Sequence, residues 1–64
     1  MTDSEEQLRR LKNTVMGAGH RLSLLANSGE LEPGAGKELS EISSELADAA
    51  RRLGQLLAAM RLQR

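Results

Sequence analysis

The sequence predicts an all-α protein: an antiparallel helical hairpin with coiled-coil-like packing, which dimerises into a four-helix bundle. Apolar residues recur at alternating spacings of 3 and 4 along two segments, with one short interruption between them. The chain has 64 residues and no Phe, Tyr or Trp, so Leu, Ile, Val, Met and Ala must form any core, a composition that suits helix packing. We therefore expect one domain over residues 1–64, with helices at about 4–27 and 33–62 and a loop at about 28–32.

The first helix is predicted from an unbroken apolar seam. Capping boxes pairing Thr2 with Glu5 or Ser4 with Gln7 are available to start it, and Asn27-Ser28-Gly29 is a typical stop. The seam residues, spaced 3, 4, 3, 4, 3, are Leu8, Leu11, Val15, Ala18, Leu22 and Leu25.

The second helix begins with Pro33, whose missing N–H is harmless at a first helical position. Folding the chain about Leu31 places Ala18 opposite Leu46 and Val15 opposite Ala49, so that large residues meet small ones. The short connection predicts an antiparallel pair of helices. The seam residues, spaced 3, 4, 3, 4, 3, 4, are Leu39, Ile42, Leu46, Ala49, Leu53, Leu56 and Met60.

A second stripe of mostly small residues runs beside this seam on both helices. With Leu8 and Leu39 as heptad position a, the stripe occupies positions e and b, and a lone hairpin is expected to leave it open. We predict that it forms an outer seam with another copy or with a partner protein, through Met16, Gly19, Ala26, Ala47, Ala50, Gly54 and Leu57.

Two glycines inside the first helix have two interpretations. Gly17 and Gly19 each cost about 1 kcal/mol relative to Ala in a helix. Close approach of a neighbouring helix would offset that cost. Alternatively, the pair marks a kink or a break near Gly17.

Charge is balanced overall but not along the hairpin. The 9 basic and 9 acidic residues give zero net charge, so the chain has no bulk attraction to nucleic acid or to an anionic membrane. Residues 1–14 with 48–64, the open end, carry a net charge of +3, and residues 15–47, the loop end, carry −3. Opposite signs at opposite ends favour an antiparallel arrangement of two hairpins. The open end includes four arginines that are candidate contacts for an anionic partner: Arg9, Arg10, Arg51 and Arg52.

The sequence offers no pattern for catalysis or for a cofactor. The segment PGAGKEL lacks the first glycine and the hydroxyl residue of a phosphate-binding loop, because Leu31 and Glu38 occupy those positions. A single His20 and the absence of cysteine argue against a metal site and exclude disulfides. We expect no enzyme activity, no cofactor, no metal and no small-molecule substrate.

The predicted location is the cytoplasm. No apolar run approaches the length of about 20 residues that a membrane span needs. The first residues, MTDSEEQ, are acidic and polar, unlike a secretory signal peptide. We also expect no association with a membrane surface.

Without a catalytic pattern, the surplus apolar surface suggests a small dimeric regulator, adaptor or antagonist that binds another protein. An alternative follows from architecture: in length and hairpin form the chain resembles the Rop family of plasmid copy-number regulators. The resemblance implies a hairpin dimer that binds paired RNA loops, here RNA or DNA through the arginine-rich face. No motif aligns, no aromatic residue is present, and no site is carried over from that family.

Overall fold

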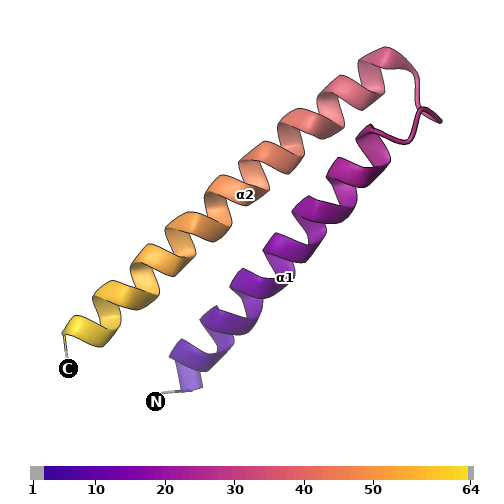
Figure 1. Ribbon diagram of the computed structural model, residues 1–64. Coiled ribbons are helices and arrows are strands. Elements are labelled where there is room, and N and C mark those ends of the chain that lie inside the picture. The colour runs from indigo at the N-terminus through magenta and orange to yellow at the C-terminus, as the bar shows by residue number, and fades with distance from the viewer. Residues whose placement is uncertain (1–2, 64) are drawn as a thin grey trace.

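The computed structural model describes residues 3–63, which form two helices packed against each other and contain no strand. Helix α1 spans Asp3–Ala26 and helix α2 spans Pro33–Leu62. They run antiparallel, so the start of α1 and the end of α2 lie at the same end of the hairpin, the open end (Figure 1). Thr2, one of the predicted capping residues, lies outside the described residues. The helical hairpin predicted from the two seams is therefore confirmed.

The end of α1 is set by the Asn27-Ser28-Gly29 segment. The Asn27 N–H donates to the Ser23 carbonyl oxygen at 3.1 Å, and the Ser28 hydroxyl donates to the Leu25 carbonyl oxygen at 2.8 Å. Gly29 then takes φ +81°, a left-handed conformation that side chains with a Cβ rarely adopt. These bonds satisfy carbonyl groups that the last turn of the helix leaves open.

The start of α2 packs closely against the end of α1. Glu32 is extended, Pro33 occupies the first turn, and the Gly36 N–H donates to the Glu32 carbonyl oxygen at 2.9 Å. A Cβ built on Gly36 would meet the Ala26 carbonyl oxygen at 3.4 Å. The glycine therefore lets the first turn of α2 approach the last residue of α1.

The helices meet along heptad positions a and e, whereas the sequence predicted positions a and d. Residues at position a, such as Leu22 and Leu46, are half-buried, and Gly19 and Ala50 at position e are buried. The predicted d residues that remain exposed are Leu11, Ala18, Leu25, Ile42 and Leu56. An interface of positions a and d and an interface of positions a and e both repeat every seven residues. Small residues at e let the two backbones approach more closely than leucines at d would.

Gly19 is the point of closest approach among the glycines of α1. A Cβ on Gly19 would lie 3.4 Å from the Leu46 Cβ and 3.5 Å from the Ser43 carbonyl oxygen, whereas one on Gly17 would meet nothing within 4 Å. Helix α1 is continuous through both glycines, so it does not break near Gly17. The close-packing interpretation is confirmed at Gly19, whereas no other part of the hairpin approaches the backbone at Gly17. The Gly19–Leu46 contact also places the register about one residue from the predicted pairing of Ala18 with Leu46.

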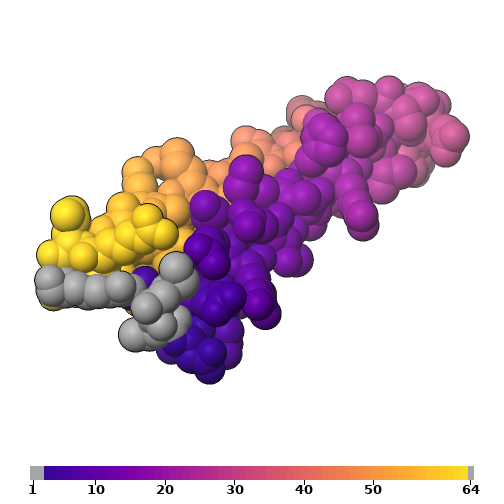
Figure 2. All heavy atoms as spheres, turned by 60° about the horizontal axis from the view of Figure 1, so that its bottom comes forward, coloured from indigo at the N-terminus to yellow at the C-terminus, as the bar shows by residue number. Residues whose placement is uncertain are grey.

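The hairpin is a rod of 49 × 15 × 11 Å between Cα atoms, with the two helices side by side along it (Figure 2). Its accessible surface is 4963 Å², whereas a compact monomer of the same mass exposes about 4,000 Å². The hairpin therefore exposes roughly 1,000 Å² more than a compact fold of its size.

Candidate protein-interaction surfaces

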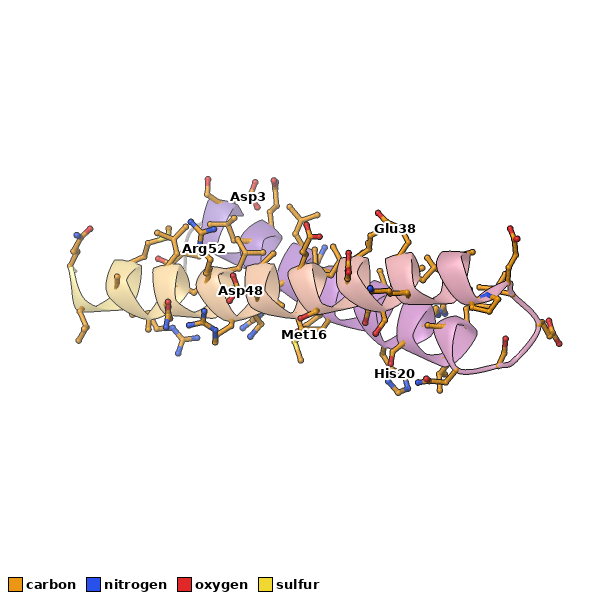
Figure 3. The ribbon with its side chains drawn as sticks, turned by 90° about the horizontal axis from the view of Figure 1, so that it is seen from above. Asp3, Met16, His20, Glu38, Asp48 and Arg52 are labelled. Carbon is orange, nitrogen blue, oxygen red and sulfur yellow. The ribbon has the colours of Figure 1, made fainter. Side chains whose placement is uncertain are left out.

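The hairpin presents two different faces, one on each side of the seam between its helices. Because the helices are antiparallel, position d of both falls on one side and position b of both on the other. Met16 and His20 point together to one side of the hairpin, and Glu38 points to the opposite side (Figure 3). We call the first side the groove face and the second the leucine face.

The groove face contains a shallow groove of about 580 Å³ between the helices. Its floor includes Gly19 and Ala50, the latter 4% exposed, and Met16 stands at its edge with 54% of its surface exposed. The residues that line it are Lys12, Met16, Gly19, His20, Ser23, Ser43, Ala47, Ala50, Arg51 and Gly54. The groove is thus a strip of small side chains with longer, partly cationic side chains beside it.

A hydrogen bond between the helices holds this groove in shape. The Ser43 hydroxyl donates to the Gly19 carbonyl oxygen at 2.7 Å in a part-buried position. The bond is possible because Gly19 carries no side chain that would hold α2 away from the backbone of α1. The sequence did not predict this contact.

The seven residues predicted to form an outer seam divide into three groups by burial. Gly19 and Ala50 are buried inside the hairpin. Three others are half-buried along the seam: Ala26, Gly54 and Leu57. A Cβ on Gly54 would lie 3.8 Å from the Lys12 Cδ. Only Met16 and Ala47 of the seven are exposed, so most of the stripe packs within the hairpin, because its small residues are what bring α1 and α2 together.

The leucine face is made of the d residues, which sequence reasoning assigned to the seam inside the hairpin. Its large side chains are between 37% and 55% exposed. The face consists of Leu11, Ala18 and Leu25 on α1 and Ile42, Ala49 and Leu56 on α2. Beside Ala18 lies a second hollow of about 490 Å³, lined by Thr14, Gly17, Ala18, Arg21 and Leu22. The face therefore has bulky residues near its two ends and a depression at its middle.

The arginines of the open end are partly engaged with acidic residues on their own helices. Arg10 bonds to Glu6 at 3.1 Å, four residues earlier, and Arg51 bonds to Asp48. The hydrogen bond and the charge of Arg51, with a smaller contribution from Arg52, hold the pKa of Asp48 below its usual value of 3.8. Arg9 is half-buried, and Arg52 is exposed.

Residues 3–63 contain neither a metal-binding cluster nor a membrane-spanning helix. No group of three His, Cys, Asp or Glu side chains in that range is placed to hold a metal ion. Neither described helix combines the length and the apolar character that crossing a membrane requires.

Comparison with protein-family models, with characterised proteins and with solved structures found no match.

Proposed function

We propose that this chain is a non-catalytic protein-interaction module: a dimeric helical hairpin that acts as a small regulator, adaptor or antagonist by binding another protein. One observation carries the proposal. Among the described residues the buried apolar side chain is Ala50, while large apolar side chains remain exposed at Leu11, Met16, Leu24, Leu25, Leu31, Ile42, Leu56 and Leu62.

Such a distribution is unfavourable for a chain that works alone. Burying apolar surface contributes about 25 cal/mol per Å², and small domains have little burial to spare. With no cysteine in the sequence, a disulfide is not available to compensate. Association with further helices supplies the missing burial, and a dimer of hairpins completes a four-helix bundle.

Two faces allow two kinds of contact. A second hairpin covers one face of the rod, and the other face is left for a different protein. The groove face suits that second role, since small residues form its floor and the flexible side chain of Met16 adapts to varied surfaces. In this arrangement the hairpin binds its target without performing chemistry on it.

Affinity capture from the cells that produce this protein tests the proposal. We expect the immobilised wild-type chain to retain a specific protein, and Met16→Glu and Ala47→Glu to lose it, because both place charge on the exposed part of the groove face. Gln55→Glu is the matched control, since Gln55 is an exposed residue outside the groove lining. The retained protein is then purified and its direct binding measured. A wild-type chain that retains no protein beyond those retained by a variant carrying both Met16→Glu and Ala47→Glu contradicts an adaptor role.

The alternative of nucleic-acid binding has less support. Arg10 and Arg51 already pair with carboxylates on their own helices, which lowers the positive charge available to phosphates. A gel-shift assay with RNA and DNA at low salt is expected to show no complex. A complex that weakens steeply with added salt, and that disappears when Arg9, Arg10, Arg51 and Arg52 are neutralised, would favour the alternative.

A further inference from the structure

The leucine face has a pattern that reads the same in both directions, and the inference drawn from it rests on the dimer of the proposed function. On α1 the face presents Leu11, Ala18 and Leu25 at intervals of seven residues, and on α2 it presents Ile42, Ala49 and Leu56. We propose that a second copy of this chain docks antiparallel on the leucine face, with a two-fold axis beside Ala18 and Ala49. The groove face, where the sequence placed the outer seam, stays outside this contact.

A two-fold dimer requires a surface that is complementary to itself after rotation. Reversing a large–small–large row returns the same row, so each bulky end meets the bulky end of the other copy. Seven residues of helix span about 10.5 Å, which sets the spacing of these layers. With the axis at Ala18, Leu11 lies opposite Leu25 of the partner subunit.

The same axis serves both helices. Gly19 lies against Leu46, and its Cβ position is 3.9 Å from the Ala47 nitrogen, so Ala18 and Ala49 lie within two to three residues, or about 4 Å, of each other along the rod. An axis that passes beside both alanines therefore crosses the rod obliquely. Helix α1 therefore packs on α1 of the other copy, and α2 packs on α2. Rotation about one axis then also brings Ile42 opposite Leu56 of the partner subunit.

The depression at the middle of the face permits the close approach that this packing needs. The 490 Å³ hollow is lined by the small residues Gly17 and Ala18 together with Thr14, Arg21 and Leu22. Small residues at the axis let the two copies of α1 come together there, while the leucines fill the space on either side.

Charge selects the antiparallel orientation. A parallel dimer would also place large residues on large ones, but it would bring the two +3 ends together and the two −3 ends together. The antiparallel dimer pairs +3 with −3. It also places exposed Arg52 close to Glu45 of the partner subunit, because 45 and 52 lie almost equally far from Ala49.

The size of the face is sufficient for a stable contact. The surplus surface of roughly 1,000 Å² is similar to the area of about 800 Å² that each partner buries in a typical stable interface. The face extends over about 14 residues of each helix, or about 21 Å of the 49 Å rod, and spans both helices. A second hairpin of the same dimensions covers it end to end.

Sedimentation equilibrium with two matched charge substitutions tests which face is used. Leu25 is 50% exposed on the leucine face and Met16 is 54% exposed on the groove face, so the two sites tolerate charge equally in the monomer. We expect Leu25→Glu to weaken dimerisation by on the order of 100-fold, because each of the two copies would bury one added carboxylate in the interface. Met16→Glu should leave the dimer unchanged. Dissociation by Met16→Glu but not by Leu25→Glu would overturn the inference and leave a dimer through the groove face.

Spin labels test the orientation and do not depend on a destabilised variant. The sequence has no cysteine, so Leu62→Cys gives one label per chain at an exposed position. In the antiparallel dimer the two labels lie about 39 Å apart along the rod, because each is 13 residues from the axis and the rise is 1.5 Å per residue. In a parallel dimer they lie level with each other. A short distance would therefore exclude the antiparallel arrangement.

Exchange of charge tests the contact across the axis. We expect Glu45→Arg to weaken the dimer several-fold by facing Arg52 of the partner subunit, and Glu45→Arg combined with Arg52→Glu to restore it. No recovery in the double variant would argue against this register.

Failure of this inference and failure of the proposed function give different results. A wild-type chain that is fully helical and monomeric at high micromolar concentration would overturn the inference and the dimer together. The capture experiment on the groove face would still decide whether the chain binds another protein.

Discussion

At the scale of single residues, the two glycines of α1 differ in their contact with α2. Gly19 lies between the helices and accepts the Ser43 hydroxyl at its carbonyl oxygen, whereas Gly17 faces open space. The sequence alone could not separate them, because both interrupt the same helical pattern. Only the rotation of α1 about its axis determines which of the two meets α2.

Substitutions at these two positions should therefore diverge. Gly17→Ala should stabilise the fold by about 1 kcal/mol through helix propensity alone. Gly19→Leu should destabilise it by roughly 1–3 kcal/mol, because the side chain must push α2 away and break the Ser43 bond. Gly17→Leu is the control for size. Urea denaturation at a protein concentration too low for dimerisation measures all three, because Gly17 also lines the hollow beside the proposed two-fold axis. Equal effects of leucine at both positions would contradict the close contact at Gly19.

The ion pair at Asp48 predicts a titration. Arg51→Gln should raise the pKa of Asp48 toward 3.8, because the variant loses the hydrogen bond and the charge that lower it. Arg52→Gln should raise the pKa less, since Arg52 lowers it through its charge alone and contributes less than Arg51 does. NMR titration of the Asp48 carboxyl carbon measures both. A larger shift for Arg52→Gln than for Arg51→Gln would be inconsistent with the pairing.

The sign of the matching stability effect follows from the lowered pKa. The contribution of the pair is fully present above pH 3.8 and is lost as the pH falls through the lower native pKa. Because Asp48 and Arg51 are both exposed, this contribution is small.

At the scale of the helices, the sequence predicted their existence, order and extent but not their rotation. Alternating spacings of 3 and 4 located both helices, and Asn27-Ser28-Gly29 with Pro33 located the loop. The sequence did not show the rotation, because a seam of positions a and d and a seam of positions a and e both repeat every seven residues. The two seams differ only in the size of their side chains. Large d residues such as Leu11 and Leu25 are typical of a helix interface, so the sequence predicted that they face the other helix. In the structure Gly19 and Ala50 face it instead, because their small size lets the two backbones approach closely. The candidate interface differs accordingly from the predicted one: Met16 and Ala47 are exposed, whereas Gly19 is buried between the helices.

The loop between the helices predicts a contrast between two glycines. Gly29→Ala should destabilise the hairpin by about 1–2 kcal/mol, because φ +81° places a Cβ against the backbone. Gly34→Ala should instead stabilise it by about 0.5–1 kcal/mol, because Gly34 is helical and a Cβ there meets nothing within 4 Å. Thermal unfolding followed by circular dichroism compares the two. Stabilisation by Gly29→Ala would show that the loop takes another conformation in solution.

At the scale of the whole molecule, stability and assembly are coupled. If a second copy covers the leucine face, dilution removes part of the buried surface along with the dimer. The melting temperature of the wild-type chain should then rise with protein concentration over the range in which the dimer forms.

Two variants provide the comparison for this concentration dependence. The Leu25→Glu variant should melt at a lower temperature that is independent of concentration, and Met16→Glu should behave as the wild-type chain does. Differential scanning calorimetry over a hundredfold concentration range gives the measurement. A wild-type melting temperature that stays constant over that range would indicate a monomer.

The rod shape also decides how the assembly appears in solution scattering. The hairpin has a radius of gyration of 14.7 Å, whereas a globular chain of this length has about 11 Å. A second rod laid alongside at a helix spacing of about 10 Å raises that radius by only about 1 Å, although the forward scattering per chain doubles. A column calibrated with globular standards would misread either species, since an elongated monomer elutes early. Intensity extrapolated to zero angle, rather than apparent size, therefore distinguishes one rod from two.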